Sequence, residues 1–590
     1  MHHVRHSPDH PLLGSPRASP DNVPSRRLYA TFTLLTVTIL TFFFIHLGLY
    51  SAYVFSSSVA NISISRYHIS TDPVTTPSEA PSAVGRIVQE GRGATEGSVI
   101  DTTSLLLPAW EIQVVVREEG WQVDGGQLYC VFPNNVTSVA IASGVLLSMG
   151  WRTFKCGMPE RARRRLPFRQ PVLMKSPEKG YPATKGPPPE LWRWNFLAYE
   201  AVSTDSDVVV FAKGVNRIGM QRSPSELTCV FGNDPSTAAR TAVTSSAMEM
   251  FRCGHPDPTE ISDLADEAGR VMISLEIARQ KEAIPSLAYY SPWHRPSTED
   301  GDPNIDNLRV QLCACTMLYN AAKFLKEWVV YNAKIGVDRF ILYDNNSNDN
   351  LTAVIEELHG SGYDIRVVPW VWQKTQESGF SHAAITLRDK CAWMMYMDVD
   401  EFVYSPAWNE SLNPSPLMLK SLLPEDIPGQ PKYGQVSINC LEFGPSDQHV
   451  HPPEGVTQGY TCRRKEDQRH KSIVMLDAIA PSLVNAVHHF TLQQEYKTKV
   501  INLEKAAVNH YKYQAWPEFR TKFRGRVSAY VVDWMLPVNL ESKDRVPGLR
   551  NKPIEPPGWA QKFCEVRDSR LKEMTARWFG DEVRRWPQRL

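Results

Sequence analysis

Residues 393–402 read WMMYMDVDEF, where a short apolar run ends on two aspartates one residue apart, Asp398 and Asp400, followed by Glu401. Carboxylates at the end of a buried strand are unfavourable unless a cation meets them. Residues i and i+2 of a strand point the same way, so strand geometry that persists to Asp400 would aim both aspartates at one spot. A divalent cation that holds a diphosphate fits that spot, because hard cations bind carboxylate and phosphate oxygens. The alternative is a strand end followed by an acidic turn.

The segments before this motif alternate between strand and helix patterns. Strand patterns are RVQLCACTML, VDRFILYD and YDIRVVPW, and helix patterns are AAKFLKEWVVYNAKIG, NDNLTAVIEELHGSG and a stretch near 378–391. This alternation predicts an α/β domain with a mostly parallel sheet over residues 303–545. Ligands bind such sheets at the carboxyl ends of the strands. Asp344 ends the second strand pattern, so we expect it to lie at the same edge as Asp398 and Asp400.

The N-terminal part of the chain predicts a membrane anchor. Residues 28–65 contain no Asp, Glu, Lys or Arg, and within them 29–55 are apolar and long enough to span a bilayer. The preceding tail, 1–28, is rich in Arg, so we expect it to be cytoplasmic and the rest of the chain luminal. A cleaved signal peptide is the alternative. Residues 56–104, rich in Ser, Thr, Pro and Gly, are predicted to form a flexible stem.

Residues 105–290 are predicted to form a β-rich domain with an internal repeat. Short Val- and Phe-rich runs are separated by Gly, Pro and Asn, which favours strands. Cys130 and Cys156 are separated by 26 residues and Cys229 and Cys253 by 24, each pair in a similar sequence context. Two β units, each closed by its own disulfide, are therefore expected. Residues 546–590 carry a helical run that we expect to pack against the body.

The composition argues against nucleic-acid binding and offers cysteines and sequons for disulfides and glycans. The chain has 64 basic and 64 acidic residues, so it lacks the basic excess of a nucleic-acid binder. A luminal location permits disulfides among its ten cysteines and glycans at five Asn-x-Ser/Thr sequons, which are Asn61, Asn135, Asn345, Asn350 and Asn409.

Several ordered motifs resemble glycosyltransferase family 92, whose plant branch contains the β-1,4-galactan synthases. They are CTMLYNAAKFLKEWVVYNAKIGVDRFILYDNNSNDN, YMDVDEF, FGPSDQH, GYTCRRKEDQRHKSIV, VHHF and NHYKYQAW, within about residues 303–545. The resemblance implies a GT-A fold, an inverting reaction, a nucleotide-sugar donor, a Mn2+ ion and a type II Golgi membrane topology. The region 105–290 resembles the carbohydrate-binding-like domain that precedes the catalytic domain in plant galactan synthases.

The resemblance also assigns provisional roles to individual residues. Asp398 and Asp400 are the expected metal ligands, with His510 as a third and the pair His488 and His489 as its competitor. Glu401 is expected to hold the geometry of the motif. Donor binding is expected at Asp344, Asp398 and Lys471; Asp344 alternatively forms only an Asx turn. A glycan on Asn345 would obstruct this site, so we expect that sequon to be unoccupied.

Other residues of the region are candidates without an assigned role. A basic cluster around Lys471 could contact phosphate or simply be solvated, and three tryptophans could stack on sugar rings or belong to the core. Inversion requires a general base, which the sequence does not single out among four carboxylates. The clusters are Arg463, Arg464, Lys465 and Arg469; Trp370, Trp372 and Trp516; and Asp447, Glu454, Glu466 and Asp467.

Together these features predict an inverting hexosyltransferase that moves galactose from UDP-galactose onto β-1,4-galactan or a related cell-wall glycan. Alternatives are a different UDP-sugar or a glycoprotein acceptor, and a non-catalytic glycan-binding membrane protein. A glycoside hydrolase needs two carboxyl groups on opposite sides of the scissile bond, which suits the i, i+2 spacing less well than one metal ion does. A homodimer is left open.

Overall fold

The computed structural model describes residues 100–580, with gaps at 108–109, 119–125, 165, 184–185, 217–219, 235, 280–281, 293–307, 468, 487, 526–547, 550–551 and 554. All described residues belong to one compact unit, 91–590. The predicted tail, the predicted anchor at 29–55 and almost all of the predicted stem lie outside the described residues. Among the described residues, no helix is long and apolar enough to cross a membrane.

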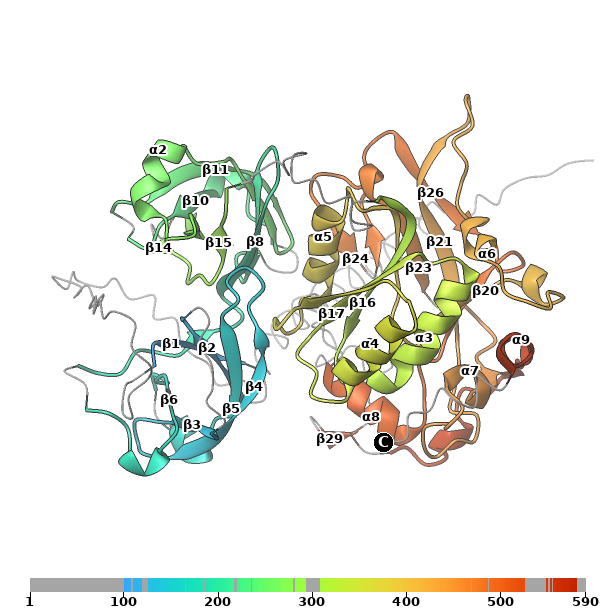
Figure 1. Ribbon diagram of the computed structural model, residues 1–590, viewed down its shortest axis with the longest axis horizontal. Helices are drawn as coiled ribbons and strands as arrows, with labels where there is room; N and C mark the ends of the chain where they lie inside the picture. The colour runs from blue at the N-terminus through green and yellow to red at the C-terminus, as the bar shows by residue number, and fades with distance from the viewer. Residues whose placement is uncertain are drawn as a thin grey trace, which may run out of the picture. The chain divides into compact units, whose positions relative to one another are not determined.

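A nine-stranded mixed sheet forms the centre of the α/β domain (Figure 1). Its strand order is β18-β17-β16-β19-β23-β21-β27-β20, with β26 paired to β21. The parallel half contains β16 (Val310–Leu318), β17 (Arg339–Asp344), β18 (Ile365–Pro369) and β19 (Cys391–Tyr396). The intervening helices are α3 (Ala322–Ile335), α4 (Leu351–Gly360) and α5 (Gln376–Thr386). The predicted alternation of strands and helices is therefore confirmed.

The other half of the sheet departs from the parallel pattern. Here β23 (His470–Met475) runs antiparallel to both β19 and β21 (Lys432–Glu442), while β26 (Tyr496–Ile501) and β27 (Ala507–His510) run parallel to β21. The last strand, β20 (Glu401–Tyr404), is antiparallel to β27. This arrangement brings the motif at 398–401 next to His510, more than a hundred residues later.

Alternate residues of β16 face two different cores. Leu312 and Ala314 belong to a cluster with α3, α4 and α9 (Arg570–Phe579), the last of which is the predicted C-terminal helix. Cys313 and Cys315 belong to a second cluster that contains the buried residues of α5. The central sheet is therefore covered by α3 and α4 on one face and α5 on the other, as in a doubly wound α/β domain.

Two β units precede this domain. The first sheet has the order β6-β3-β4-β5-β2-β1-β7, and its first strand starts at Thr102, within the predicted stem. The second has the order β14-β13-β10-β11-β12-β9-β8, with β15 paired to β13. The disulfides Cys130–Cys156 and Cys229–Cys253 join the first and third strands of equivalent antiparallel meanders, β3-β4-β5 and β10-β11-β12. The predicted repeat and both predicted disulfides are confirmed.

The strands of these two units have the following bounds. In the first unit they are β1 (Thr102–Leu106), β2 (Glu111–Val116), β3 (Leu128–Val131), β4 (Thr137–Val145), β5 (Arg152–Gly157), β6 (Val172–Met174) and β7 (Trp192–Arg193). In the second they are β8 (Leu197–Ser203), β9 (Val208–Lys213), β10 (Leu227–Phe231), β11 (Ala239–Ala247), β12 (Met250–Cys253), β13 (Val271–Ile277), β14 (Glu282–Ala283) and β15 (Tyr289–Tyr290).

The β units and the α/β domain share one hydrophobic core. Tyr199 and Phe211 of the second unit each lie 6.3 Å, between ring centres, from Trp370. Polar contacts join the same parts, because Glu249, paired with Lys213 at 2.8 Å, accepts a 3.0 Å hydrogen bond from Ser378. Residues of the predicted β-rich domain thus also bury the α5 face of the catalytic sheet.

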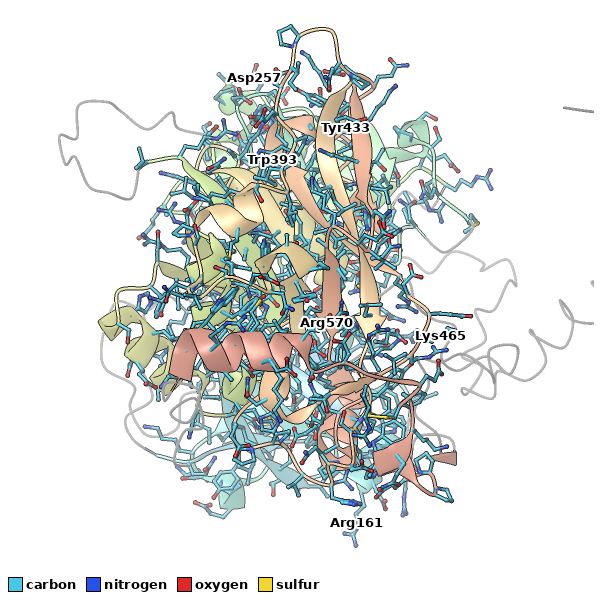
Figure 2. All side chains as sticks on the ribbon, turned by 90° about the vertical axis from the view of Figure 1, so that its right-hand side faces the viewer. Arg161, Asp257, Trp393, Tyr433, Lys465 and Arg570 are labelled. Atoms are coloured by element: carbon cyan, nitrogen blue, oxygen red, sulfur yellow. A yellow bond between two sulfur atoms is a disulfide. The ribbon has the colours of Figure 1, made fainter. Side chains whose placement is uncertain are left out.

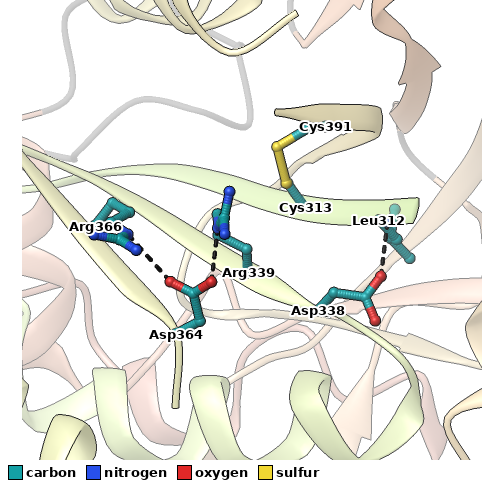
Figure 3. Close-up of a disulfide and its surroundings, with 7 residues drawn as sticks. All are labelled: Leu312, Cys313, Asp338, Arg339, Asp364, Arg366 and Cys391. Atoms are coloured by element: carbon teal, nitrogen blue, oxygen red, sulfur yellow. Dashed lines mark hydrogen bonds and ion pairs between the residues drawn. A yellow bond between two sulfur atoms is a disulfide. The ribbon is translucent and has the colours of Figure 1, made fainter. Parts of the chain in front are cut away.

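Two further disulfides fall within the α/β domain. Cys313–Cys391 joins β16 to β19 near their amino ends, beside Asp338, which accepts from the Leu312 backbone, and Asp364, which pairs with Arg339 (Figure 3). Cys462–Cys564 ties the C-terminal segment to β22 (Cys462–Arg463). In the described residues the two remaining cysteines, Cys315 and Cys440, are free and buried.

Candidate active site

The two aspartates of the motif lie in a turn and not in a strand. β19 ends at Tyr396, and Glu401 N–H donates a 3.1 Å hydrogen bond to the Asp398 carbonyl. The Glu401 side chain closes the turn, because its Oε2 accepts from the Asp398 N–H at 2.9 Å. The expectation that strand geometry aims Asp398 and Asp400 at one spot is therefore wrong. The expected supporting role of Glu401 agrees with this contact.

The neighbouring helix and strand hold this turn in place. Trp328 of α3 donates its indole N–H to the Glu401 carbonyl at 3.2 Å, and Tyr511 N–H donates to the Asp400 carbonyl at 2.9 Å. Glu401 lies opposite His510 in the antiparallel pair β20–β27. The aspartates are thus presented by buried, regular elements, which suits a site that needs fixed geometry.

Asp398 lies between a cation and an amide. Its Oδ2 is 3.0 Å from Lys471 Nζ, and its Oδ1 accepts a 3.0 Å hydrogen bond from Gln376 Nε2. A third of its side chain is exposed. Burial alone would raise the pKa of Asp398, but the Lys471 charge holds it well below its usual range. Asp398 therefore presents a carboxylate with one side open to a ligand.

Lys471 is a buried cation shared by several groups. Its Nζ is 2.9 Å from Glu401 Oε1 and 2.6 Å from Nε2 of His488. Burial alone would lower the pKa of Lys471, but Asp398 and Glu401 raise it above its usual value. The pKa of His488 falls to about 3, through burial and the Lys471 charge, so this imidazole is neutral and accepts from Lys471.

Glu401 is the most buried acid of the motif. Burial, together with the charges of Asp398 and Asp400, raises the pKa of Glu401, against the opposing effect of Lys471. Glu401 Oε1 lies 3.3 Å from His510 Nδ1. The Glu401 side chain thus contacts both the Asp398 backbone N–H and the His510 imidazole.

Asp400 and His510 form a second pair of potential ligands. His510 Nε2 lies 3.6 Å from Asp400 Oδ2, which also contacts the ammonium of Lys522 on α8 (Trp516–Gly525). Across the described residues, no three His, Cys, Asp or Glu side chains gather closely enough to hold a metal ion. The donor chemistry nevertheless fits a divalent cation such as Mn2+, since carboxylate oxygen and imidazole nitrogen converge where Lys522 now supplies positive charge. Asp400 and His510, with Asp398 on the other side of the turn, would hold it.

The loop after β17 forms the neighbouring part of the edge. Asp344 Oδ1 accepts from the Ser347 N–H at 2.9 Å, a local turn contact that reaches one residue further than the Asx turn offered as its alternative role. Asn345 donates its side-chain amide to the carbonyls of Trp370 and Trp372, both at 2.7 Å. Asn345 N–H also donates to the Leu318 carbonyl, so the loops after β16 and β17 are bonded together.

Most residues of the predicted basic cluster form ion pairs elsewhere or are exposed, and do not contact the motif. Arg463 pairs with Asp568 at 2.7 Å, and Arg464 lies 3.5 Å from Glu442. Lys465 is exposed and extends away from the protein (Figure 2), and Arg469 is exposed too. Lys471, the favoured member, is the one that the structure places against the motif.

The tryptophans are core residues. Trp370 and Trp372 are buried against the second β unit, and Trp516 packs with Trp559 in a separate small cluster. Their suggested role in stacking on sugars is therefore wrong.

The four candidate bases lie on the surrounding loops. Asp447 and Asp467 accept from the amides of Gln561 and Asn439, and Glu454 and Glu466 are exposed. This geometry does not single out one of the four as the base.

Comparison with known proteins identifies the family. The sequence profile of glycosyltransferase family 92 matches residues 309–542. A family 92 protein of Oryza sativa subsp. japonica is 38% identical over 412 residues, which are 66% of this chain and 67% of the relative. The chain belongs to glycosyltransferase family 92. A family 92 protein of Arabidopsis thaliana is likewise 38% identical, over 66% of this chain and 68% of the relative.

Solved structures show only a distant likeness to this family 92 glycosyltransferase. A mannosyltransferase from Pyrobaculum calidifontis in complex with GDP-Man and Mn2+ is 11% identical, with a TM-score of 0.21 over 38% of this chain and 62% of that one. Glucosyl-3-phosphoglycerate synthase from Mycobacterium tuberculosis, with Mn2+ and UDP, is 14% identical with a TM-score of 0.17 over 32% and 64%. Likeness at this level carries no argument about the site.

Two residues of the site were not foreseen from the sequence. Gln376 begins α5 and reaches Asp398, while Lys522 of α8 reaches Asp400. Neither lies in a motif with a spacing that indicates ligand binding. The signal that could have found Gln376 is its position just after β18, since that connection also ends at the carboxyl edge of the sheet.

Proposed function

We propose that this protein is a metal-dependent, inverting hexosyltransferase that moves galactose from UDP-galactose onto β-1,4-galactan or a related cell-wall glycan. The observation that carries the proposal is the contact of Asp400 with His510, on the same turn that presents the partly exposed Asp398 at the carboxyl edge of the sheet. Family membership supports glycosyl transfer; the galactan synthases that the motifs resemble support the choice of galactose.

The residues in and around the turn have separate roles in binding the metal ion and the donor. Asp400 and His510 would bind the divalent cation, which, when bound, supplies charge neutralisation for the departing diphosphate. Asp398, oriented by Gln376, faces the same ligand from its exposed side. Lys471 holds a positive charge beside this diphosphate position without becoming exposed, since it is fixed between Asp398 and Glu401.

We further propose that the enzyme is a type II Golgi membrane protein, anchored by residues 29–55 with its catalytic domain in the lumen. Four disulfides among the described residues support an oxidising compartment. Protease protection of the C-terminal domain in sealed Golgi vesicles would test this topology. Digestion of that domain without detergent would contradict it.

A donor screen tests the proposed reaction. Full-length protein is incubated with Mn2+ and each of several nucleotide sugars, with and without galacto-oligosaccharides, and UDP release is measured. We expect acceptor-dependent release from UDP-galactose, its loss on chelation, and a decrease of at least about 100-fold in Asp400→Asn, because a ligand to the charge-neutralising ion is removed. A different preferred sugar would overturn galactose; metal-independent turnover would overturn the proposed metal site.

A further inference from the structure

A lysine of the first β unit lies at the carboxyl edge of the catalytic sheet. Lys155 belongs to β5, and its ammonium nitrogen is 5.7 Å from the centre of the Tyr319 ring. Tyr319 directly follows β16, and the charge of Asp344, the last residue of β17, also acts on Lys155. The β unit therefore places a cation beside the two strand ends where α/β sheets bind ligands.

A β-bulge brings this hairpin close to the catalytic domain. The pairing of β4 with β5 shifts register between Ala142 and Val145, and Gly144 within the bulge has a φ of +88°. A Cβ added to Gly144 would lie 3.3 Å from Val371 Cγ1 and 3.7 Å from Asn346 Oδ1. Glycine is thus required twice here, for the positive φ and for the close approach of the two parts.

The groups gathered at this edge have the chemistry of a nucleoside site. The Tyr319 side chain is 41% exposed. Asn346 is only 8% exposed, and its Nδ2 is a buried donor without a hydrogen-bond partner in the part of the chain that the structure describes. Burial lowers the pKa of Lys155, an effect that Glu111 and Asp344 oppose, so its ammonium is held in a partly dry environment. An aromatic ring, a carboxylate and donors suit a base and a ribose.

The distance from this edge to the metal-binding turn also fits. β16 lies between β17, which ends at Asp344, and β19, which leads to Asp398. Neighbouring strands are about 4.8 Å apart, so the two strand ends are separated by about 10 Å. A nucleoside diphosphate can span this distance, with its diphosphate at the turn and its nucleoside beside Tyr319.

We propose that Lys155 and Tyr319 form the nucleoside end of the donor site, with the ring stacked on the base and the ammonium donating to an oxygen of the base or ribose. This inference rests on the proposed function, because it needs a nucleotide donor. It makes the first β unit a part of the catalytic site and gives a physical reason for the shared core.

Binding measurements on the full chain test this placement. We would measure the dissociation constants of UDP by calorimetry and of uridine by ligand-observed NMR, both with Mn2+. Lys155→Met should weaken both ligands by the same factor, about five- to tenfold, because the lost contact lies on the part that they share. Tyr319→Ala should weaken both, whereas Tyr319→Phe should retain binding. Arg152→Met, an exposed cation on the same strand, is the matched control and should change neither.

Three results would overturn the inference. The first is unchanged binding of both ligands by Lys155→Met, with or without a lower melting temperature, which would make Lys155 a contact between the parts only. The second is a loss confined to UDP, which would place Lys155 at the diphosphate. The third is a wild-type protein that binds no UDP; this result alone would also refute the proposed function.

Discussion

The side-chain amide of Gln376 donates a 3.0 Å hydrogen bond to Oδ1 of Asp398. Gln376 is the first residue of α5, two residues before Ser378, whose hydroxyl donates to Glu249 of the second β unit. A contact from the β region therefore reaches the motif through a single turn of helix. The orientation of Asp398 depends on how α5 is seated as well as on the motif itself.

Removal of this amide should slow the reaction without unfolding the protein. A hydrogen bond to a charged group contributes about 1.5–3 kcal/mol, so Gln376→Ala should reduce kcat by about tenfold or more. Gln448→Ala, which removes an amide bonded to the Gly459 carbonyl, is the matched control. Initial rates of UDP release and melting temperatures would be measured for both. Equal rates for the two variants would show that Gln376 does not position Asp398.

Substitutions of the buried charged residues around Lys471 should have strongly coupled effects on stability. Lys471→Met leaves Asp398 and Glu401 without their shared cation, and loss of one partner of a buried ion pair costs about 3–5 kcal/mol. We expect a marked fall in melting temperature. Glu401→Gln in the same chain should recover part of this loss, because one unpaired carboxyl group becomes neutral.

A double-mutant cycle separates this coupling from general damage. Denaturation would be compared for Lys471→Met, Glu401→Gln and the double variant, with the exposed Lys432→Met as the control. Effects that simply add would contradict the network.

Stability should depend on pH through Glu200 of β8. Burial raises its pKa from 4.5 to about 7, against a hydrogen bond from Ala201 N–H. The folded protein thus keeps a proton that the unfolded chain releases, so this contribution to stability is complete below about pH 4.5 and is lost as the pH rises through 7. The shift corresponds to about 3 kcal/mol as an upper limit.

Glu200→Gln removes this dependence because the amide does not titrate. Relative to wild type, its melting temperature should rise between pH 5 and pH 8. Melting curves across that range would be compared with those of the exposed Glu178→Gln. A difference that stays constant with pH would show that Glu200 is not a buried, protonated acid.

The sequon at Asn345 should carry no glycan. Both hydrogens of its amide are used, because Nδ2 donates to the Trp370 and Trp372 carbonyls. Attachment of a sugar replaces one of these hydrogens and forces the loop to open. Peptide mapping of the secreted or membrane-extracted protein should find Asn345 unmodified. A glycan found there would contradict the position of this loop and the donor site beside it.

The parallel half of the catalytic sheet could be predicted because each of its strands and helices has a recognisable pattern in its own stretch of sequence. β16, β17, β18 and the helices between them have apolar patterns of the right period, and parallel connections leave few alternatives. The antiparallel half could not be predicted in this way. β21 ends at Glu442 and β23 begins at His470, with the short α7 (Val456–Gly459) and β22 between them, so their pairing depends on contacts distant in sequence.

In the candidate site, too, residues in local motifs could be predicted and contacts between distant segments could not. Asp398, Asp400 and Lys471 stand in recognisable motifs, and the structure brings Lys471 to Asp398. The turn geometry of the aspartates depends on the Glu401 side chain, which no periodic pattern records. The suggestion that Trp370 stacks on a sugar ring was wrong for a related reason. The β region buries Trp370, and the packing of that region against α5 has no signal in the sequence.

The disulfide Cys462–Cys564 has a practical consequence for work on the isolated catalytic domain. The family profile ends at residue 542, so a protein shortened to that boundary would lose Cys564 and all of α9. Under oxidising conditions Cys462 would then be an odd thiol, open to mixed disulfides and to covalent pairing of two molecules. Leu571, Met574 and Phe579 would also leave the core that covers α3. Expression of the chain through at least residue 580 avoids an artefactual dimer that could be mistaken for a native one.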